Sequence, residues 1–299
     1  MGEVTKIDHV YGNSQEVVET GDLIFNVGAI LKDVAKGWPG VIHQVNKSTY
    51  LDVFGTPPRL AEDAYQAYYA LYINENTLGE YIRVVASDAK YAHLTYATLD
   101  GARTEGASAF DTAIEPVTAN QMVAWVKDGV TDDDKYGIAI TSIDATKKTF
   151  VVEISEKQAD ATVVLLGSYT VNFIPGSVNA NNEPLFIESV FASKCPQIGI
   201  KVAEDADFDK VVAHTIEYFT GGLPGGDPVE ADYLAAWSLL NDEEIDLDMI
   251  FTAGNTESTH LTNALSVALT RMVRIEIDNP AGQTVAAAIA WLDGLSLQS

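Results

Sequence analysis

The last seventy residues of the chain alternate between two spacings of apolar positions. Helical spacing, with apolar side chains three or four positions apart, occurs in 231–244, 257–272 and 284–295. Short apolar runs and period-two alternation, which are typical of strands, occur in 245–254 and 273–277. The apolar side chains expected to form the buried faces of the three helices are Leu234, Trp237 and Leu240, then Leu261, Leu265, Ala268, Leu269 and Met272, and finally Val285, Ile289 and Leu292. This order of elements predicts an αβαβα layer.

A β-rich region precedes this layer. One helical pattern occupies 59–74, after Pro57 and Pro58, which favour the start of a helix. The other apolar runs are strand-like and separated by turn residues: 22–31, 40–45, 81–86, 136–143, 149–156, 161–174, 184–191 and 197–202. The predicted fold class is therefore α+β, with an antiparallel β-rich sandwich or barrel-like domain, flanking helices and the αβαβα layer.

Changes in composition divide the chain into three parts. Residues 1–21 are polar, lack a steady period and predict a flexible arm. Residues 22–225 form the β-rich domain, in which the Ala-, Thr-, Asp- and Gly-rich stretch 87–135 predicts a surface excursion or a protruding insertion. Residues 226–299 form the αβαβα part. Gly294 has the position of a helix C-cap before a further strand, so we expect this part to be truncated at its C terminus.

The composition is apolar enough for a folded protein and strongly acidic. The hydrophobic fraction is 47%, and 43 acidic residues against 18 basic ones give a net charge of −25. Nucleic-acid binding needs clustered Lys and Arg, whereas the longest basic cluster is Lys147–Lys148, so we expect no nucleic-acid partner. No apolar run approaches the ~20 residues of a bilayer span, and the N terminus lacks a secretory signal. The sequence predicts synthesis in a cytoplasm without membrane insertion.

Residues able to carry chemistry are few and dispersed. The single cysteine, Cys195, excludes an intramolecular disulfide and a Cys-rich metal site, and its apolar surroundings predict a small buried hydrophobe. No histidine within twelve residues could act as its base. The histidines lie far apart and show no metal-binding spacing: His9, His43, His93, His214 and His260.

Two loops have the composition of ligand-binding motifs but lack the required residues. The glycine-rich segment 219–228 has neither the G-x-x-x-x-G-K spacing nor a lysine for a phosphate, and it predicts a linker. The acidic segment 128–137 lacks the calcium ligands expected at the fifth and twelfth positions counted from Asp132, and it predicts a solvated turn. We therefore predict no catalytic, cofactor-binding or metal-binding residue, no cofactor, and a protein that is not an enzyme.

Four segments, in order along the chain, resemble the contractile tail sheath proteins of tailed, myovirus-type bacteriophages. "KGWPGVIHQVNKSTYLDVFGTPP" with "YIRVVA" is similar to the family's G-P and F-G-x-P run, and "PLFIESVFASK" to its hydrophobic-E-x-V strand. "DYLAAWSLLNDEEIDLDMIFTAG" is similar to its helix and apolar strand. The final signature comprises Asp278, Asn279, Pro280, Ala281, Gly282, Thr284, Ala288, Ile289 and Trp291, and Asn279 stands where the family commonly has Pro.

The resemblance covers roughly residues 22–299 and implies a structural protein of the virion tail. Sheath subunits assemble in the host cytoplasm as a homopolymer around the tail tube, contact the baseplate, and contract to drive the tube through the host envelope. Neighbouring subunits stay linked because terminal arms add strands to adjacent sheets. Since the C-terminal arm is missing, the resemblance implies that this fragment stays monomeric.

Three alternatives stay open. The chain could be the sheath subunit of a related contractile injection system. An α/β enzyme would place a nucleotide at the strand ends near Gly254 and Asp278, since ligands bind outside the carboxyl ends of strands in open sheets. An acidic module that binds carbohydrate would use exposed Tyr and Trp side chains.

Overall fold

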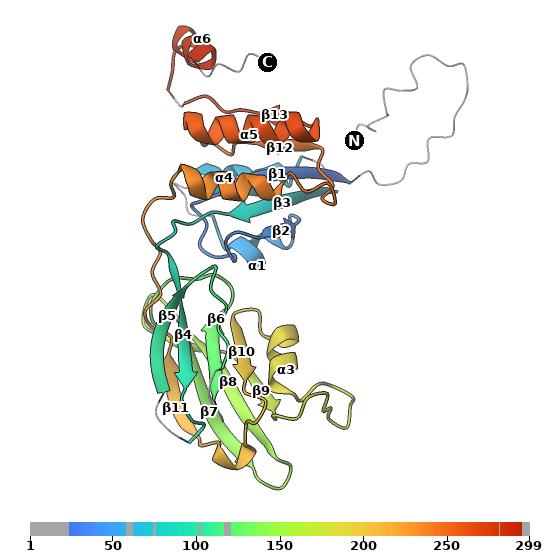
Figure 1. Ribbon diagram of the computed structural model, residues 1–299, viewed down its shortest axis with the longest axis vertical. Helices are drawn as coiled ribbons and strands as arrows, with labels where there is room; N and C mark the ends of the chain where they lie inside the picture. The colour runs from blue at the N-terminus through green and yellow to red at the C-terminus, as the bar shows by residue number, and fades with distance from the viewer. Residues whose placement is uncertain are drawn as a thin grey trace, which may run out of the picture. The chain divides into compact units, whose positions relative to one another are not determined.

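The computed structural model divides the chain into two compact units, and each is described by itself (Figure 1). The α/β unit contains the described residues within 24–34, 40–83 and 233–294, and the sandwich unit those within 35–39 and 84–232. The residues that the structure describes are 24–57, 62–73, 76–100, 103–116, 121–280 and 282–294. The predicted arm, 1–21, lies outside them. The α+β fold class is confirmed, with mixed helices and several antiparallel strand pairs.

A five-stranded sheet forms the centre of the α/β unit, in the order β13-β12-β1-β3-β2. The strands are β1 (Phe25–Leu31), β2 (Ile42–Val45), β3 (Thr77–Arg83), β12 (Met249–Phe251) and β13 (Arg274–Glu276). Strands β13, β12, β1 and β3 run parallel to one another, and β2 runs antiparallel to β3. Nearly every residue of β1 is buried, as expected for a parallel strand that is covered on both faces.

Helices cover both faces of this sheet, because successive side chains of a strand point to opposite sides. Val27, Ala29 and Leu31 share a core with α1 and α2. Gly28 lies between them and faces Leu240, on the side of α4. The helices of the unit are α1 (Tyr50–Phe54), α2 (Glu62–Ala70), α4 (Glu230–Leu239), α5 (Ser258–Arg271) and α6 (Val285–Gly294). The predicted helix–strand alternation at the C-terminal end of the chain is thus confirmed, whereas α1 was not predicted.

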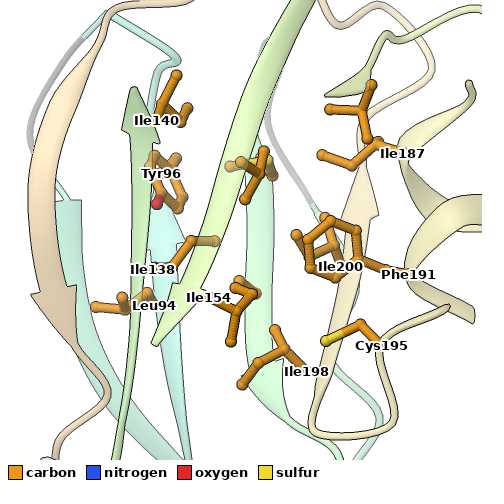
Figure 2. Close-up of a cluster of buried hydrophobic side chains, with 14 of the residues drawn as sticks. Leu94, Tyr96, Ile138, Ile140, Ile154, Ile187, Phe191, Cys195, Ile198 and Ile200 are labelled. Carbon is orange, nitrogen blue, oxygen red and sulfur yellow. The ribbon is translucent and has the colours of Figure 1, made fainter. Parts of the chain in front are cut away.

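The sandwich unit contains two four-stranded antiparallel sheets, ordered β10-β6-β4-β5 and β11-β7-β8-β9. The strands are β4 (Lys90–Tyr96), β5 (Arg103–Ala109), β6 (Met122–Val126), β7 (Tyr136–Asp144), β8 (Thr149–Lys157), β9 (Val163–Val171), β10 (Ile198–Val202) and β11 (His214–Tyr218). One apolar core joins the sheets, and Figure 2 shows Leu94, Ile138 and Ile154 among its members. The strand predicted over 149–156 is confirmed as β8, whose alternate residues Phe150, Val152 and Ile154 are fully buried.

Helix α3 (Ile187–Lys194) fills the space beside β10, where the sequence predicted a strand over 184–191. The strand prediction is wrong. Ile187, Val190 and Phe191 are all buried, and their spacing of three and four places them on one face of a helix. A short apolar run fits either element, and the available partner decides which one forms. Here the partner is β10, against which α3 packs.

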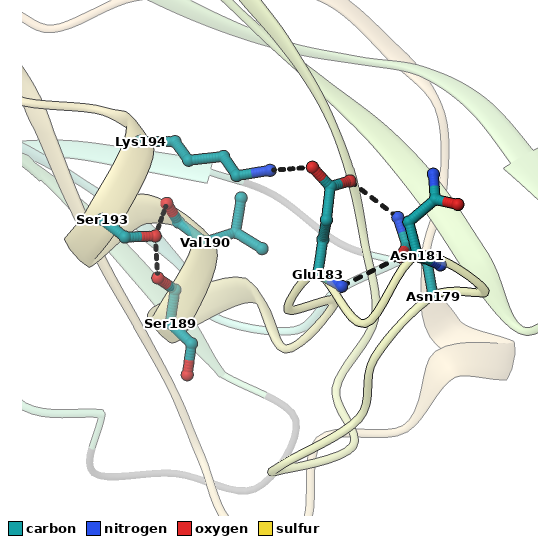
Figure 3. Close-up of polar contacts among 7 residues, drawn as sticks. All are labelled: Asn179, Asn181, Glu183, Ser189, Val190, Ser193 and Lys194. Atoms are coloured by element: carbon teal, nitrogen blue, oxygen red, sulfur yellow. Dashed lines mark hydrogen bonds and ion pairs between the residues drawn. The ribbon is translucent and has the colours of Figure 1, made fainter.

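The loop between β9 and α3, predicted from its Pro, Gly and Asn content, is held by polar contacts (Figure 3). The Asn179 side chain donates to Glu183 Oε2 at 2.8 Å and accepts the Glu183 backbone N–H at 3.0 Å. Lys194 Nζ lies 3.6 Å from Glu183 Oε1. These contacts tie the loop to the end of α3.

The stretch 87–135 is not a surface excursion. It supplies β4, β5 and β6, and the inward side chains of β4 and β6 lie in the sandwich core: Ala92, Leu94, Tyr96, Met122, Ala124 and Val126. The sequence analysis did not predict these strands, because alanine, threonine and glycine occupy many of their positions and interrupt the alternation of large apolar and polar side chains. Whether residues 87–135 protrude from a larger assembly stays a prediction.

The boundary between the units also differs from the predicted division at 225/226. β1 pairs with β12, so Val27 lies opposite Met249 although 222 positions separate them in the chain. Residues from both ends of the chain therefore build one sheet. Spacing within a segment predicts an element but not which distant strand will pair with it.

Several apolar side chains predicted to face the core are exposed instead. Leu234, Leu269, Met272, Val285 and Ile289 are each more than half exposed, while Leu261 and Trp237 are buried as predicted. The buried face of α5 is centred on Leu261, Ala264, Val267 and Ala268, which turns Leu269 and Met272 outward.

Candidate assembly surface

Cys195 lies in the sandwich core at the end of α3, and 1% of it is exposed (Figure 2). Burial is the main reason why the pKa of its thiol is raised above the ordinary value. A reactive thiolate needs a lowered pKa and access to solvent. The prediction that Cys195 is a small buried hydrophobe is confirmed.

The described histidines occupy separate places in the fold. His43 stacks edge-on against Phe54, and His93 lies on β4. His214 Nε2 lies 3.3 Å from the Tyr96 hydroxyl, and burial lowers the pKa of both His93 and His214. Within the described parts of the chain, no three His, Cys, Asp or Glu side chains converge to hold a metal ion.

His260, in the first turn of α5, is the most deeply buried of the described histidines, with 1% exposed. The Trp237 indole donates to its Nδ1 at 3.3 Å, so the proton resides on Nε2, which has no hydrogen-bond partner. Burial, with a smaller contribution from Lys32, lowers the pKa of His260 to about 4. His260 therefore packs α4 against α5 in its neutral form.

The backbone of the glycine-rich segment 219–228 forms hydrogen bonds with other residues of the chain. Leu223 exchanges two backbone hydrogen bonds with Lys90, at 2.8 and 2.9 Å. The Gly226 N–H donates to the carboxylate of Asp88 at 3.0 Å. Gly221 and Gly225 have positive φ angles, which only glycine adopts without strain. The segment predicted to be a linker therefore belongs to the sandwich unit and leads from it into α4.

The acidic turn 132–134 borders an open depression of about 520 Å³. Lys157 Nζ lies 3.5 Å from Asp134, and Lys135 Nζ lies 3.9 Å from Glu156. Asp132 and Asp133 are exposed to solvent. Residues 132–134 thus form a solvated turn beside two lysines, whereas Val130, Thr131 and Tyr136 of the predicted turn segment 128–137 are buried.

The strand ends proposed for a nucleotide site are occupied by the chain's own carboxylate. Asp278 Oδ2 accepts the Gly254 N–H at 2.9 Å and lies 3.3 Å from the Thr252 hydroxyl. A phosphate would need these donors, and a carboxylate in their place repels it. A neighbouring cavity of about 240 Å³ is lined by Gln66, Tyr69, Ala70, Ile73, Met249, Phe251, Glu276 and Asp278, without a Lys or Arg. This arrangement disfavours nucleotide binding.

The α/β unit exposes apolar side chains at the end of α5 and along α6. Met272 and Leu269, at the end of α5, are 92% and 59% exposed. Val285 and Ile289 lie one helical turn apart on α6 and are 79% and 54% exposed. Figure 1 shows α6 beyond β13, at one end of the unit. We call these four residues the α5–α6 surface.

A second apolar surface follows α2. Tyr65 and Tyr69 stack with their ring centroids 5.5 Å apart, and the Tyr68 and Tyr72 hydroxyls lie 2.9 Å from each other. Tyr69 and Tyr72 are more than half exposed. Their spacing opposite the buried Ala64 and Ala67 could have revealed this surface from the sequence.

Both surfaces suit recognition of another protein. Exposed aromatic and aliphatic groups gather at protein interfaces, while single exposed apolar residues are common everywhere. None of the helices in the described residues has the length and apolarity needed to cross a bilayer. The described side chains thus offer apolar surfaces for packing against another protein.

Comparison with known proteins gives a likeness in fold. No family model matches the chain, and no curated protein gives a significant match. The structure is similar to the sheath tail protein of Desulfitobacterium hafniense, with a TM-score of 0.50 and 13% identity over 90% of this chain and 52% of that protein. For the sheath tail protein of Listeria innocua the TM-score is 0.49, the identity 11% and the coverage 83% and 44%. The chain spans about half the length of these proteins, and it has a sheath-like fold.

Proposed function

We propose that this chain is part of a structural subunit of a contractile tail sheath, which polymerises through contacts with copies of itself. The observation that carries the proposal is the sheath-like fold, found together with the sheath signatures of the sequence. A subunit of this kind works through contacts with its neighbours, and the exposed apolar groups of the α5–α6 surface would be buried in such contacts.

The β13 edge is the place where we expect assembly to begin. β13 closes the order of the sheet at one end and pairs with β12. An exposed strand edge accepts a further strand through main-chain hydrogen bonds. A strand from elsewhere in the protein or from a neighbouring copy would extend the sheet here.

The tail of a phage virion is the location that this function implies, with assembly in the host cytoplasm. The tail tube and the baseplate are the further partners, and contraction would drive the tube through the host envelope. The sheath of a related contractile injection system would use the same surfaces, and the fold does not distinguish between the two machines.

Electron microscopy of the protein encoded by the complete open reading frame tests this function. We expect hollow tubes with a regular helical repeat. A parallel thermal-shift screen with nucleotides, divalent metals and sugars is expected to leave the melting temperature unchanged, since no ligand stabilises a protein that does not bind it. A product that stays unassembled at every concentration, or that gains stability from one of these ligands, would overturn the proposal.

A further inference from the structure

The cavity of about 240 Å³ in the α/β unit lies between α2 and the β12–β13 end of the sheet. Its floor is apolar, because Met249 and Phe251 are 5% and 6% exposed and belong to the core that α2 covers. Ala70 and Ile73 add further apolar groups to the lining, and Ile73 is 59% exposed. The cavity therefore offers apolar walls to a group that enters from solvent.

Two carboxylates complete this lining. Glu276, the last residue of β13, is exposed to solvent. Asp278 follows two positions later, and its Oδ2 accepts the Gly254 N–H at 2.9 Å. The described residues that line the cavity include no Lys or Arg to balance these two groups. The cavity is thus apolar and negatively charged at once.

Tyr69 contributes an aromatic ring to the same lining and is 58% exposed. The ring stacks on Tyr65, with centroids 5.5 Å apart, and meets Tyr68 edge-on at 5.6 Å. Its neighbours hold the ring in place although more than half of the residue is exposed. A cation over such a ring is stabilised by about 0.5–1 kcal/mol at an exposed site.

The combination of these three features selects a long cationic side chain. Binding sites for whole small molecules usually have volumes of about 300–1,000 Å³, so this cavity suits a smaller group. Arginine and lysine pack their aliphatic stems along apolar surface and keep the charged head at its edge. A guanidinium group, in addition, pairs with carboxylates through two parallel hydrogen bonds and stacks on aromatic rings. Arginine therefore fits the lining better than lysine.

Charge indicates that the arginine belongs to a different, basic protein. The net charge of −25 attracts a basic partner and repels a second copy of this chain. Tyr65 and Tyr72, close to Tyr69 along the chain, are 37% and 52% exposed. Tyrosine is enriched at protein interfaces, so these rings would contact the residues that flank the arginine.

We propose that this cavity binds an arginine side chain from a basic segment of another protein, with its guanidinium paired to Glu276 and Asp278 and stacked on Tyr69. The site is formed by the α/β unit alone. It does not depend on whether the complete protein forms tubes.

Titration of the 299-residue chain with the blocked peptide Ala-Leu-Arg-Leu-Ala, followed by NMR chemical shifts, tests the site. Sodium chloride at about 0.15 M screens the general attraction between the acidic chain and a cation. We expect shifts centred on α2 and the ends of β12 and β13. The same peptide with glutamine in place of arginine should bind roughly tenfold more weakly or worse, because it loses the charge-assisted hydrogen bonds.

Variants of the lining separate this site from general electrostatic attraction. Glu276→Gln and Tyr69→Ala should each weaken binding of the arginine peptide by roughly threefold or more. Tyr69→Phe keeps the ring and should bind as the wild type does. Asp133→Asn is the matched control for Glu276→Gln, since it removes one exposed carboxylate elsewhere, and it should leave the dissociation constant unchanged. Circular dichroism checks that each variant is folded.

Equal affinity for the arginine and glutamine peptides would overturn the site. So would equal effects of Glu276→Gln and Asp133→Asn, because the attraction would then be general. A dimer of the chain alone that Glu276→Gln dissociates would show that a second copy occupies the cavity, which also contradicts the proposal. None of these results bears on tube formation, which is measured on the complete protein.

Discussion

Asp63 shows how a single buried carboxylate fixes the α/β unit. Its side chain is almost fully buried, and Oδ2 accepts the backbone N–H groups of Lys32 and Asp33 at 2.6 and 3.0 Å. Hydrogen bonds to a charged group are worth about 1.5–3 kcal/mol each, and removing the acceptor leaves donors unpaired. We expect Asp63→Ala to lower the free energy of unfolding by about 2–3 kcal/mol in urea denaturation.

Asp133→Ala is the control for this measurement, because Asp133 is an exposed acidic residue in a turn. Surface substitutions of this kind usually change stability by less than about 0.5 kcal/mol. Equal effects of the two variants would show that the carboxylate of Asp63 does not hold the end of β1 to α2.

His260 gives the α/β unit a pH-dependent stability. Burial lowers its pKa to about 4 in the folded chain, against about 6.5 in an unfolded one. Between these values the unfolded state binds the proton and the folded state does not, so stability falls as the pH drops from 7 towards 4. The loss attributable to His260 is about 3 kcal/mol. Burial lowers the pKa of His93 and His214 as well, which adds to the trend in the same direction.

Urea unfolding at a series of pH values measures this dependence. His260→Leu should flatten the slope between pH 7 and 4, because it removes the histidine whose pKa burial lowers to about 4. A slope that is the same in the wild type and in His260→Leu would contradict the assignment.

At the scale of elements, α3 seals the sandwich core. Phe191 is fully buried and packs against the ring of Tyr169, with centroids 5.1 Å apart. Truncation of a buried phenylalanine usually costs about 3–5 kcal/mol. We expect Phe191→Ala to destabilise the protein by this amount in thermal or urea unfolding.

Lys194→Ala is the control on the same helix. Its ion pair with Glu183 is nearly half exposed, and such pairs contribute about 0–1 kcal/mol. If Phe191→Ala costs no more than Lys194→Ala, the helix does not complete the core.

The sequence predicted those elements whose pattern is decided locally. The sequence pattern predicted β8 and α5 correctly, because each of these elements has one solvent-exposed face and one buried face. The strand predicted over 184–191 became α3, and β4 to β6 were missed, because their composition leaves the choice to packing partners far away in the chain. The residues of the α5–α6 surface were predicted to be buried, because exposed apolar residues of an interface have the same spacing along a helix as buried ones.

At the scale of the whole molecule, two open edges distinguish the units. The α/β unit ends at β13 with the α5–α6 surface, and the sandwich unit ends at β9. The β13 edge suits a strand that comes from outside the described residues.

Assembly of α6 variants, observed by electron microscopy, tests most directly whether this protein works through contacts with its own copies. In the product of the complete open reading frame, we expect Ile289→Lys to abolish tubes, because it places a charge in the α5–α6 surface. Ala287→Lys, on the opposite side of the same helix, should still form them. Tubes of normal length from Ile289→Lys, or none from the wild type, would contradict the account.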